Sequence, residues 1–314
     1  MKSFDVLVVG ELNVDMILDD IEGFPEVGKE ILANQLTVTL GSSSAIFASN
    51  LSALGRSVAF VGLTGKDSFS DLVRDSLESK NVNTDFIIGV EEYSTGLTVV
   101  MNYGMDRANV TFPGAMEHLT GMHITDEMLL SSKHMHLSSI FLQKGLKDQA
   151  VELFRRAKKL GLTTSMDPQW DPTENWDLDL EKLLPHIDIL MPNLVEFTNI
   201  TGCGQLASGI EKIKGFANHI IIKDGIRGAH LWENGKLTTK PAFINHEVAD
   251  CIGAGDSFDA GFISEFIQGS DLERCAEVGN VMGAINTVAP GGTTAFKSLE
   301  HVKKIAKEKF AFTI

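Results

Sequence analysis

Cysteine is scarce in this sequence, and basic charge and long apolar runs are scarce as well. The 314 residues include three cysteines, Cys203, Cys251 and Cys275, and none of them forms a CxxC pair. An odd number of widely spaced cysteines favours free thiols in a reducing compartment over a disulfide framework. We therefore expect a cytoplasmic protein.

We expect the N-terminal region to form a first buried strand rather than a membrane span or a cleaved leader. Its apolar run "VLVVG" at residues 6–10 is followed at once by Glu11, and no small-residue cleavage site comes after it. The formal net charge is −15. This acidity argues against nucleic acid or an anionic membrane as the main partner, although a local basic pocket for an anionic substrate remains compatible with it.

Short apolar runs typical of buried strands alternate with segments of helical spacing. The apolar runs cover residues 6–10, 57–63, 134–140, 163–167, 188–193 and 219–225. Helical spacing covers residues 45–55, 71–81 and 147–161. This alternation predicts an α/β fold whose mainly parallel sheet is flanked by helices on both faces.

Two stretches, residues 13–40 and 93–112, alternate apolar and polar residues with no helix between their strands. They predict antiparallel strands that lie outside the main sheet and pair into a small β-sheet lid. The predicted core then consists of residues 1–12, 41–92 and 113–314. An exposed edge of the lid sheet offers a place for pairing in a homodimer.

The stretch "DCIGAGDSFDAGFI" at residues 250–263 carries the clearest chemistry. Helical spacing starts directly after Asp256, so Gly253, Ala254 and Gly255 open a helix whose unpaired amides form an anion hole. A carboxylate beside such a loop can take a proton from a hydroxyl that attacks phosphorus. A helix-capping aspartate is the structural alternative. Neither GxGxxG nor a Walker A loop matches, because Phe258 and Asp67 occupy positions that those motifs reserve for other residues.

This stretch resembles the signature DTxGAGDxFxAG of the ribokinase-like (PfkB) carbohydrate kinases. Further segments resemble motifs of the same family in the same order, over nearly the whole chain: residues 9–15, 40–55, 61–70, 191–202, 221–229 and 279–292. The resemblance implies a Rossmann-like core with a β-sheet lid. It also implies an ATP- and Mg²⁺-dependent kinase that phosphorylates a hydroxyl of a sugar or sugar derivative.

The resemblance implies a role for individual residues as well. Asp256 is the catalytic base, and the amides of Gly253, Ala254 and Gly255 form the anion hole. The substrate side consists of Asn13, Asp15, Gly41, Ser42 and Arg107. Arg107 projects from the predicted lid, where it is placed to meet a carboxylate or phosphate of the substrate or to remain solvated.

On the nucleotide side the resemblance places Asn193, Glu196, Lys223, Gly225 and Asn280. Asn193 and Glu196 are implied to organise Mg²⁺ and the phosphates, chiefly through water, and an N-cap with a capping box is the alternative for this pair. The resemblance also implies a possible K⁺ site made of backbone carbonyls, at Asp250, Ile252, Ala289 and Gly291.

Some positions depart from the family pattern. Ser42 follows Gly41 where a second glycine is usual, and Ile46 replaces an asparagine. Either the substrate lacks a hydroxyl at that point, or Ser43 and Ser44 make the contact. The segment "DPQWDP" at residues 167–172 lacks the usual Asn-x-Arg, so we predict no role for it.

Two alternatives to a sugar kinase remain: a nucleoside kinase of the same fold and a non-catalytic sugar-binding relative. The first requires more aromatic residues in the lid than Tyr93, Tyr103 and Phe112 supply, and the retained Asp256 argues against the second. His134 and His136 share one face of a strand as two zinc ligands do, but no third ligand is spaced nearby. We therefore expect a histidine pair without metal.

Overall fold

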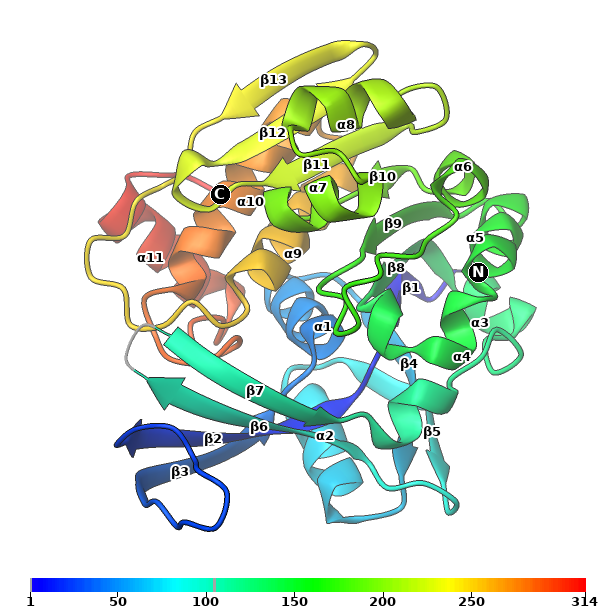
Figure 1. The fold of residues 1–314 in the computed structure, drawn as a ribbon. Coiled ribbons are helices and arrows are strands. Elements are labelled where there is room, and N and C mark those ends of the chain that lie inside the picture. Colours follow the sequence, from blue (N-terminus) through cyan, green and yellow to red (C-terminus); the bar gives the residue numbers. More distant parts are fainter. Residues whose placement is uncertain (1, 104–105) are drawn as a thin grey trace.

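A nine-stranded sheet runs through the protein in the order β13-β12-β11-β10-β9-β8-β1-β4-β5 (Figure 1). The computed structural model describes residues 2–103 and 106–314. The strands are β1 Phe4–Val9, β4 Val58–Gly65, β5 Asn83–Val90, β8 Ser132–Ser138, β9 Thr163–Asp167, β10 Ile189–Leu190, β11 His219–Lys223, β12 Ala229–Glu233 and β13 Lys236–Lys240. Neighbours from β5 to β11 pair in parallel, and β12 and β13 add an antiparallel hairpin at one edge.

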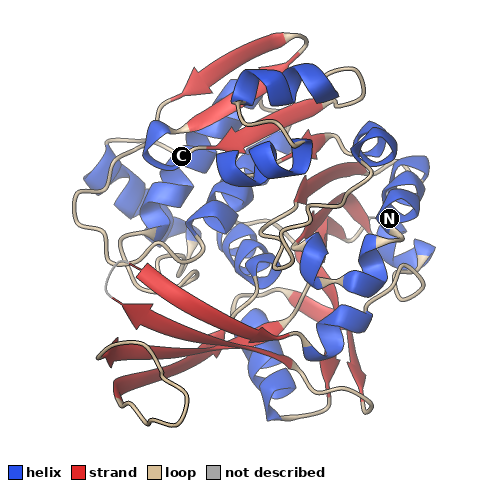
Figure 2. Ribbon diagram, viewed as in Figure 1, coloured by secondary structure: helices blue, strands red, loops and turns tan. Residues whose placement is uncertain are grey.

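Helices cover both faces of this sheet (Figure 2). One face carries α1 Ser43–Ala53, α2 Ser68–Ser79, α9 Ala254–Phe266 and α10 Leu272–Asn286, with α11 Leu299–Phe310 packed on α10. The other face carries α3 Asp126–Leu130, α4 Lys144–Lys147, α5 Ala150–Lys159, α6 Leu180–Leu183, α7 Leu194–Thr201 and α8 Leu206–Ile213. Short 3₁₀ turns lie at η1 Gly114–His118, η2 Ile140–Leu142, η3 Leu184–His186 and η4 Gly225–Arg227.

The central strand β1 shows why the sequence produces these layers. Val6 and Val8 pack in the cluster formed with α1 and α9, whereas Leu7 and Val9 pack in the cluster formed with α3 and α5. Alternate side chains of a strand point to opposite faces, so a continuous apolar run serves two helical layers at once. The predicted α/β fold with a smaller second sheet is confirmed.

The second sheet has the order β3-β2-β6-β7 and projects from the core beside α2 (Figure 1). Its strands are β2 Asn13–Ile21, β3 Ala33–Leu40, β6 Gly96–Tyr103 and β7 Asp106–Phe112. Met1 and residues 104–105, which fall inside the predicted core and lid stretches, lie outside the described residues.

One expectation about this sheet was wrong. The outer pairs β2–β3 and β6–β7 are antiparallel as predicted, but the central pair β2–β6 is parallel. The reason is that β2 follows β1 and β6 follows β5. Because β1 and β5 belong to the same parallel sheet, both excursions leave its carboxyl edge in the same direction.

The histidine pair of β8 is buried, and its ring nitrogens contact hydroxyl groups. His134 contacts Thr163 and Ser165, and His136 contacts Ser165 and Ser138, at 2.7–2.9 Å. Burial lowers the pKa of His134 to about 3, so the ring is neutral. Among the residues that the structure describes, no cluster of metal-ligating side chains is found and no helix is long and apolar enough to cross a bilayer.

Candidate active site

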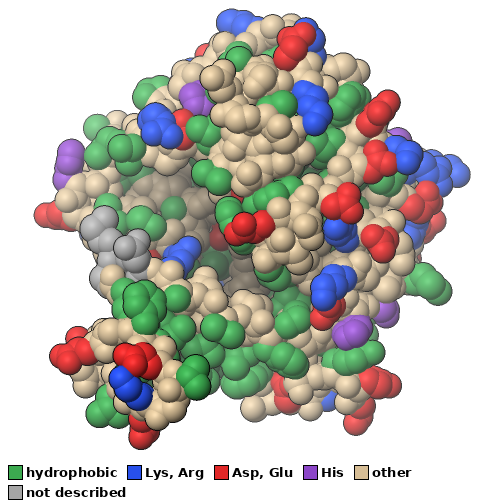
Figure 3. Space-filling view, in the orientation of Figure 1, with side chains coloured by type: hydrophobic (Ala, Val, Ile, Leu, Met, Phe, Trp, Pro, Cys, Tyr) green, Lys and Arg blue, Asp and Glu red, His purple; other side chains and the backbone are tan. Residues whose placement is uncertain are grey.

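A cavity of about 1220 Å³ opens between the carboxyl edge of the large sheet and the second sheet (Figure 3). Its lining includes Asn13, Asp15 and Arg107 from the second sheet and Asn193, Lys223 and Asn280 from the core, with the start of α9 included. Pockets for one small ligand commonly measure about 300–1,000 Å³. The cavity is therefore large enough for two ligands.

The polar wall under the second sheet starts at β2. The side-chain amide of Asn13 donates to Asp15 (2.9 Å) and to Thr98 (3.0 Å). Burial raises the pKa of Asp15 to about 6, while nearby Arg107 lowers it. A Cβ on Gly41 would lie 2.2 Å from Asp15 Oδ1, so only glycine leaves room for these side chains. The structure thus brings together the predicted residues Asn13, Asp15, Gly41 and Arg107.

Two of the three serines at residues 42–44 use their hydroxyl groups in hydrogen bonds within the protein. Ser42 Oγ donates to the carbonyl of Glu11 (2.6 Å) and accepts from the amide of Ala45 (2.9 Å), which caps α1. Ser44 is buried and bonds the Glu11 carboxylate, so it cannot also contact a substrate. Ser43 lines the cavity and remains as the hydroxyl that can compensate for Ile46.

The start of α9 is open to an anion. Gly253 adopts φ 75°, which L side chains rarely accept, and no side chain of the described residues caps the helix. A Cβ on Gly253 would lie 2.8 Å from the Cα of Gly292 and 3.0 Å from Ile46. The first-turn amides therefore face the cavity in a loop where only small residues fit.

A polar network, partly buried, fixes this loop to α1 and α10. Asp250 accepts from the amides of Ile252 and Gly291, both at 2.9 Å, and so ties together the two segments predicted to hold K⁺. Asn286 donates to the carbonyl of Ile252 (2.6 Å). Asn50 donates to Ser257 and to the carbonyl of Gly292, both at 2.9 Å. Ala289, the other predicted K⁺ position, lies two residues before Gly291 in the loop that Asp250 holds. The carbonyl oxygen of Ile252 already accepts one hydrogen bond, from Asn286.

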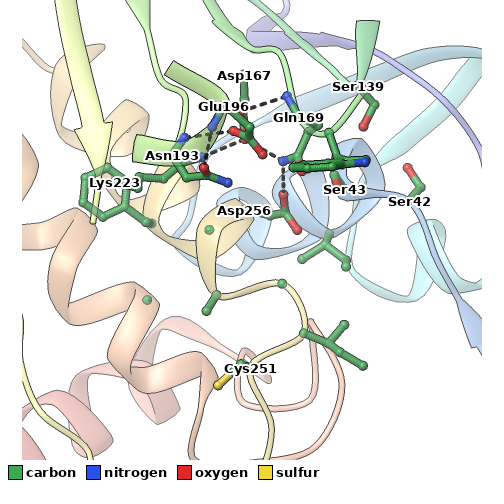
Figure 4. A pocket seen from close by; sticks show the side chains of 18 of the residues that line it. Ser42, Ser43, Ser139, Asp167, Gln169, Asn193, Glu196, Lys223, Cys251 and Asp256 are labelled. Atoms are coloured by element: carbon green, nitrogen blue, oxygen red, sulfur yellow. Dashed lines mark hydrogen bonds and ion pairs between the residues drawn. The ribbon is translucent and has the colours of Figure 1, made fainter. Parts of the chain in front are cut away.

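Asp256 lies in the first turn of α9 and is only 7% exposed. Burial, with a contribution from nearby Asp167, raises the pKa of its carboxyl to about 8 against the opposing charge of Lys223. This carboxyl contacts Gln169, whose amide nitrogen donates to Oδ1 at 2.9 Å (Figure 4). A carboxyl with a pKa near neutrality exchanges a proton readily at physiological pH, as a general base must.

Lys223, at the end of β11, lies between two buried carboxyl groups. Its ammonium donates to Asp167 (2.7 Å) and Asp259 (2.9 Å). Burial alone would lower the pKa of Lys223, but these two carboxyls raise it above its ordinary value. A Cβ on Gly255 would lie 3.7 Å from this ammonium. The positive charge therefore lies directly beside the open amides of α9.

Asn193 and Glu196 form a capping box at the start of α7. Asn193 Oδ1 accepts from the amide of Glu196 (2.9 Å), and Glu196 Oε2 accepts from the amide of Asn193 (2.8 Å). The structural alternative for this pair is thus present. Both residues also line the cavity, and burial, with a contribution from Asp167, raises the pKa of Glu196 to about 7.

The remaining predicted nucleotide residues line the cavity on the side of β11 and α10. Asn280 donates to the carbonyls of Lys240 and Pro241, at 3.2 and 3.1 Å, and holds the segment after β13 against α10. Gly225 adopts φ 54° in the turn after β11. This side of the cavity also has an apolar lining that includes Phe243, Ile244 and Val248, which suits a flat aromatic ligand.

Sequence reasoning missed Glu11, Asp167, Gln169 and Asp259. Asp167 and Gln169 lie in the segment to which no role was assigned, yet Gln169 contacts Asp256 and Asp167 contacts Lys223. A signal was present for two of them, because Glu11 follows β1 by two residues and Asp167 ends β9, at the carboxyl edge where ligands of α/β folds bind. Asp259 follows Asp256 by three residues, so it lies on the same side of α9.

Comparison with known proteins identifies carbohydrate kinases that resemble this protein over almost the full chain. A sequence model described as pfkB family carbohydrate kinase matches residues 3–299. An ATP-dependent ribose-1-phosphate kinase of Halopiger xanaduensis is 28% identical over 97% of this chain and 99% of its own length.

Two solved structures have the same fold. Arabidopsis thaliana ribokinase, complexed with ribose and ATP, superposes with a TM-score of 0.83 at 23% identity, covering 97% of this chain and 99% of its own. A candidate ribokinase II from E. coli, in complex with ATP and Mg²⁺, gives 0.83 at 22% identity with the same coverage. The expectation of a carbohydrate kinase is confirmed, and the chain belongs to the pfkB family of carbohydrate kinases.

Proposed function

We propose that this kinase transfers the γ-phosphoryl group of ATP to a hydroxyl of a small sugar or sugar derivative, with Asp256 as the base. The observation that carries the proposal is the position of Asp256: it is a buried carboxyl in the first turn of an uncapped helix, in a cavity large enough for two ligands. A base for the nucleophile and a cradle for the phosphoryl group are what phosphoryl transfer requires.

Proton transfer and phosphoryl transfer involve different groups of the proposed site. Asp256 takes the proton of the acceptor hydroxyl while the hydroxyl oxygen attacks the γ-phosphorus, and ADP leaves with the electron pair of the broken P–O bond. The amides of Gly253, Ala254 and Gly255 donate to the oxygens of the transferring phosphoryl group. Lys223, beside Gly255, adds positive charge at the same place.

Asn193 and Glu196 would hold Mg²⁺ through water, because an amide oxygen and a carboxylate lining the cavity are hard oxygen donors. When bound, the ion neutralises phosphate charge. Gly225 and Asn280 would frame the adenine. The second sheet acts in this proposal as a lid over the acceptor, since Asp15, Thr98 and Arg107 point from it into the cavity.

The acceptor is the less defined of the two substrates. Asn13 and Asp15 are suited to grip neighbouring hydroxyls, and Arg107 is suited to an acidic or phosphorylated sugar. The ribose-1-phosphate kinase among the relatives acts on such a phosphorylated sugar. A nucleoside remains the second candidate, because Phe141 and Trp170 add aromatic surface to this side of the cavity.

A coupled ADP-release screen over neutral sugars, sugar acids, sugar phosphates and nucleosides tests the function. We expect ADP release with one of the first three classes. With that acceptor, Asp256→Ala should lose roughly 10²–10⁴ in turnover and keep its acceptor affinity, as for a lost general base. Near-wild-type turnover of this variant would end the assignment of the base. No ADP release with any acceptor would contradict the kinase itself.

Burial of the base also predicts a change in stability with pH. The folded state raises the pKa of Asp256 above its unfolded value, so the folded protein binds the proton more tightly and its stability falls as pH rises from about 4 to about 8. Asp256→Asn removes this effect. We expect its melting temperature to exceed that of the wild type by more at pH 8 than at pH 5. The exposed Asp75→Asn on α2 serves as control, and an equal shift at both pH values would contradict the expectation.

We also propose that K⁺ stimulates the enzyme by binding backbone carbonyls near Ile252 and Ala289. The support is that Asp250 and Asn286 fix these two loops side by side next to α9. Replacing K⁺ by tetramethylammonium at constant ionic strength should lower turnover. Unchanged turnover would remove this site from the mechanism.

The lid is proposed to pair two subunits. The face of the lid opposite to Asp15 and Thr98 carries one row of apolar side chains across the four strands: Val38, Met16, Val99 and Val110. The two outer members, Val38 and Val110, are exposed. An apolar row on an outer face favours association. Sedimentation should give a dimer that Val110→Glu dissociates, and a monomeric wild type would contradict the pairing. The three free cysteines agree with the proposed cytoplasmic location.

A further inference from the structure

Gln169 occupies a strained position next to the proposed base. It follows β9 by two residues and adopts φ 60°, a left-handed conformation that is unusual for a residue other than glycine or asparagine. Its side chain turns back towards α9 and lies between Asp167 and Asp256 (Figure 4). Strain of this kind persists where surrounding contacts impose it, and it is common at functional sites.

Both hydrogens of the Gln169 amide have a carboxylate partner. The nitrogen Nε2 donates to Asp167 Oδ2 at 2.6 Å and to Asp256 Oδ1 at 2.9 Å. Because Asp167 Oδ2 also accepts from Lys223, this oxygen is an acceptor, and the nitrogen and not the oxygen of the amide must face it. The orientation of the side chain is therefore fixed by chemistry, and both donors are used.

Asp167, the other hydrogen-bond partner of the Gln169 amide, is held in place by burial and by an ion pair. Asp167 is fully buried, and Lys223 donates to the same Oδ2 atom that accepts from Gln169. Lys223 in turn donates to Asp259, which is also buried. The series Asp259–Lys223–Asp167–Gln169–Asp256 thus connects the base to a buried ion pair.

The loop that carries Gln169 is held independently of Asp256. The carboxylate of Asp171 accepts from the amides of Thr173 (2.8 Å) and Trp176 (2.7 Å) and from the Thr173 hydroxyl (2.8 Å). These contacts close a turn directly after Gln169. The amide of Gln169 is therefore presented to the base by a preorganised loop, and this costs no reorganisation during the reaction.

We propose that Gln169 is a positioning residue for the base: it holds Oδ1 of Asp256 and leaves Oδ2 as the oxygen that takes the proton of the acceptor hydroxyl. The inference rests on the proposed function, in which Asp256 is the base. In the transfer the proton moves from the hydroxyl to Oδ2, the new O–P bond forms and the bond to ADP breaks. Gln169 keeps its own protons throughout and stabilises the carboxylate form of Asp256 before the transfer.

Gln169→Met tests the proposal, because methionine has a similar length and no N–H donor. We expect kcat to fall about 10- to 100-fold, the size of one lost hydrogen bond to a charged group. The acid limb of the pH profile should move to higher pH, since the carboxylate form loses a donor. KM for ATP and acceptor should stay within about twofold, because a positioning contact to the base leaves ground-state binding unchanged.

Gln169→Glu sharpens the test. It replaces a donor with a third carboxyl between Asp167 and Asp256, so the acid limb should move further upward than in the methionine variant. Asn175→Ala is the matched control, since this exposed side chain lies in the same loop and, among the described residues, bonds Thr173 alone. It should behave as the wild type in kcat, KM and pH profile.

The outcomes separate this inference from the function on which it rests. A methionine variant with wild-type kcat and an unmoved acid limb overturns the role of Gln169. Lower kcat with an unmoved limb and raised KM values also overturns it and indicates a packing role instead. If Asp256→Asn retains wild-type turnover, the base assignment itself is wrong. If Asp256→Asn is inactive while Gln169→Met is normal, only the role of Gln169 is wrong.

Discussion

The buried ammonium of Lys223 is the interaction on which the rest of the site depends. Asp167 and Asp259 bond it directly, and it lowers the pKa of both Glu196 and Asp256. Several carboxyl groups cannot share a buried region without a compensating charge, because burial of an unpaired carboxylate is costly. One cation from β11 therefore allows acidic side chains from β9, α7 and α9 to meet in the proposed active site.

The same arrangement explains how a protein with a large negative net charge can bind a polyanionic nucleotide. The net charge of −15 does not describe the floor of the cavity, where the amides at the start of α9 lie beside the Lys223 ammonium. Field strength at a site depends on nearby dipoles and charges in a region with little water, and distant surface charge is screened. The acidic groups next to this floor are partly protonated near neutral pH, since burial raises the pKa of Asp256 to about 8 and of Glu196 to about 7.

Much of the fold and part of the site were predictable from the sequence. The strands and helices repeat short-range patterns, and Gly253 to Asp256 form one continuous segment whose helix start can be recognised locally. The direction of β2 against β6 was not predictable in this way, because it depends on the edge from which two distant excursions leave the sheet. Gln169 was missed for a similar reason, since 87 residues separate it from Asp256.

The sequence by itself determined the elements, the glycine-rich start of α9 and the carboxyl that follows it, because these depend on neighbours within a few residues. Only the tertiary structure decided which groups surround that carboxyl. Asp167 and Gln169 lie at the end of β9 and Lys223 ends β11, all far from Asp256 in the sequence, and their effect on the proton of Asp256 depends on burial and on distances through space. Such quantities arise only when the chain has folded, and they determine whether an aspartate at a helix start is a cap or a base.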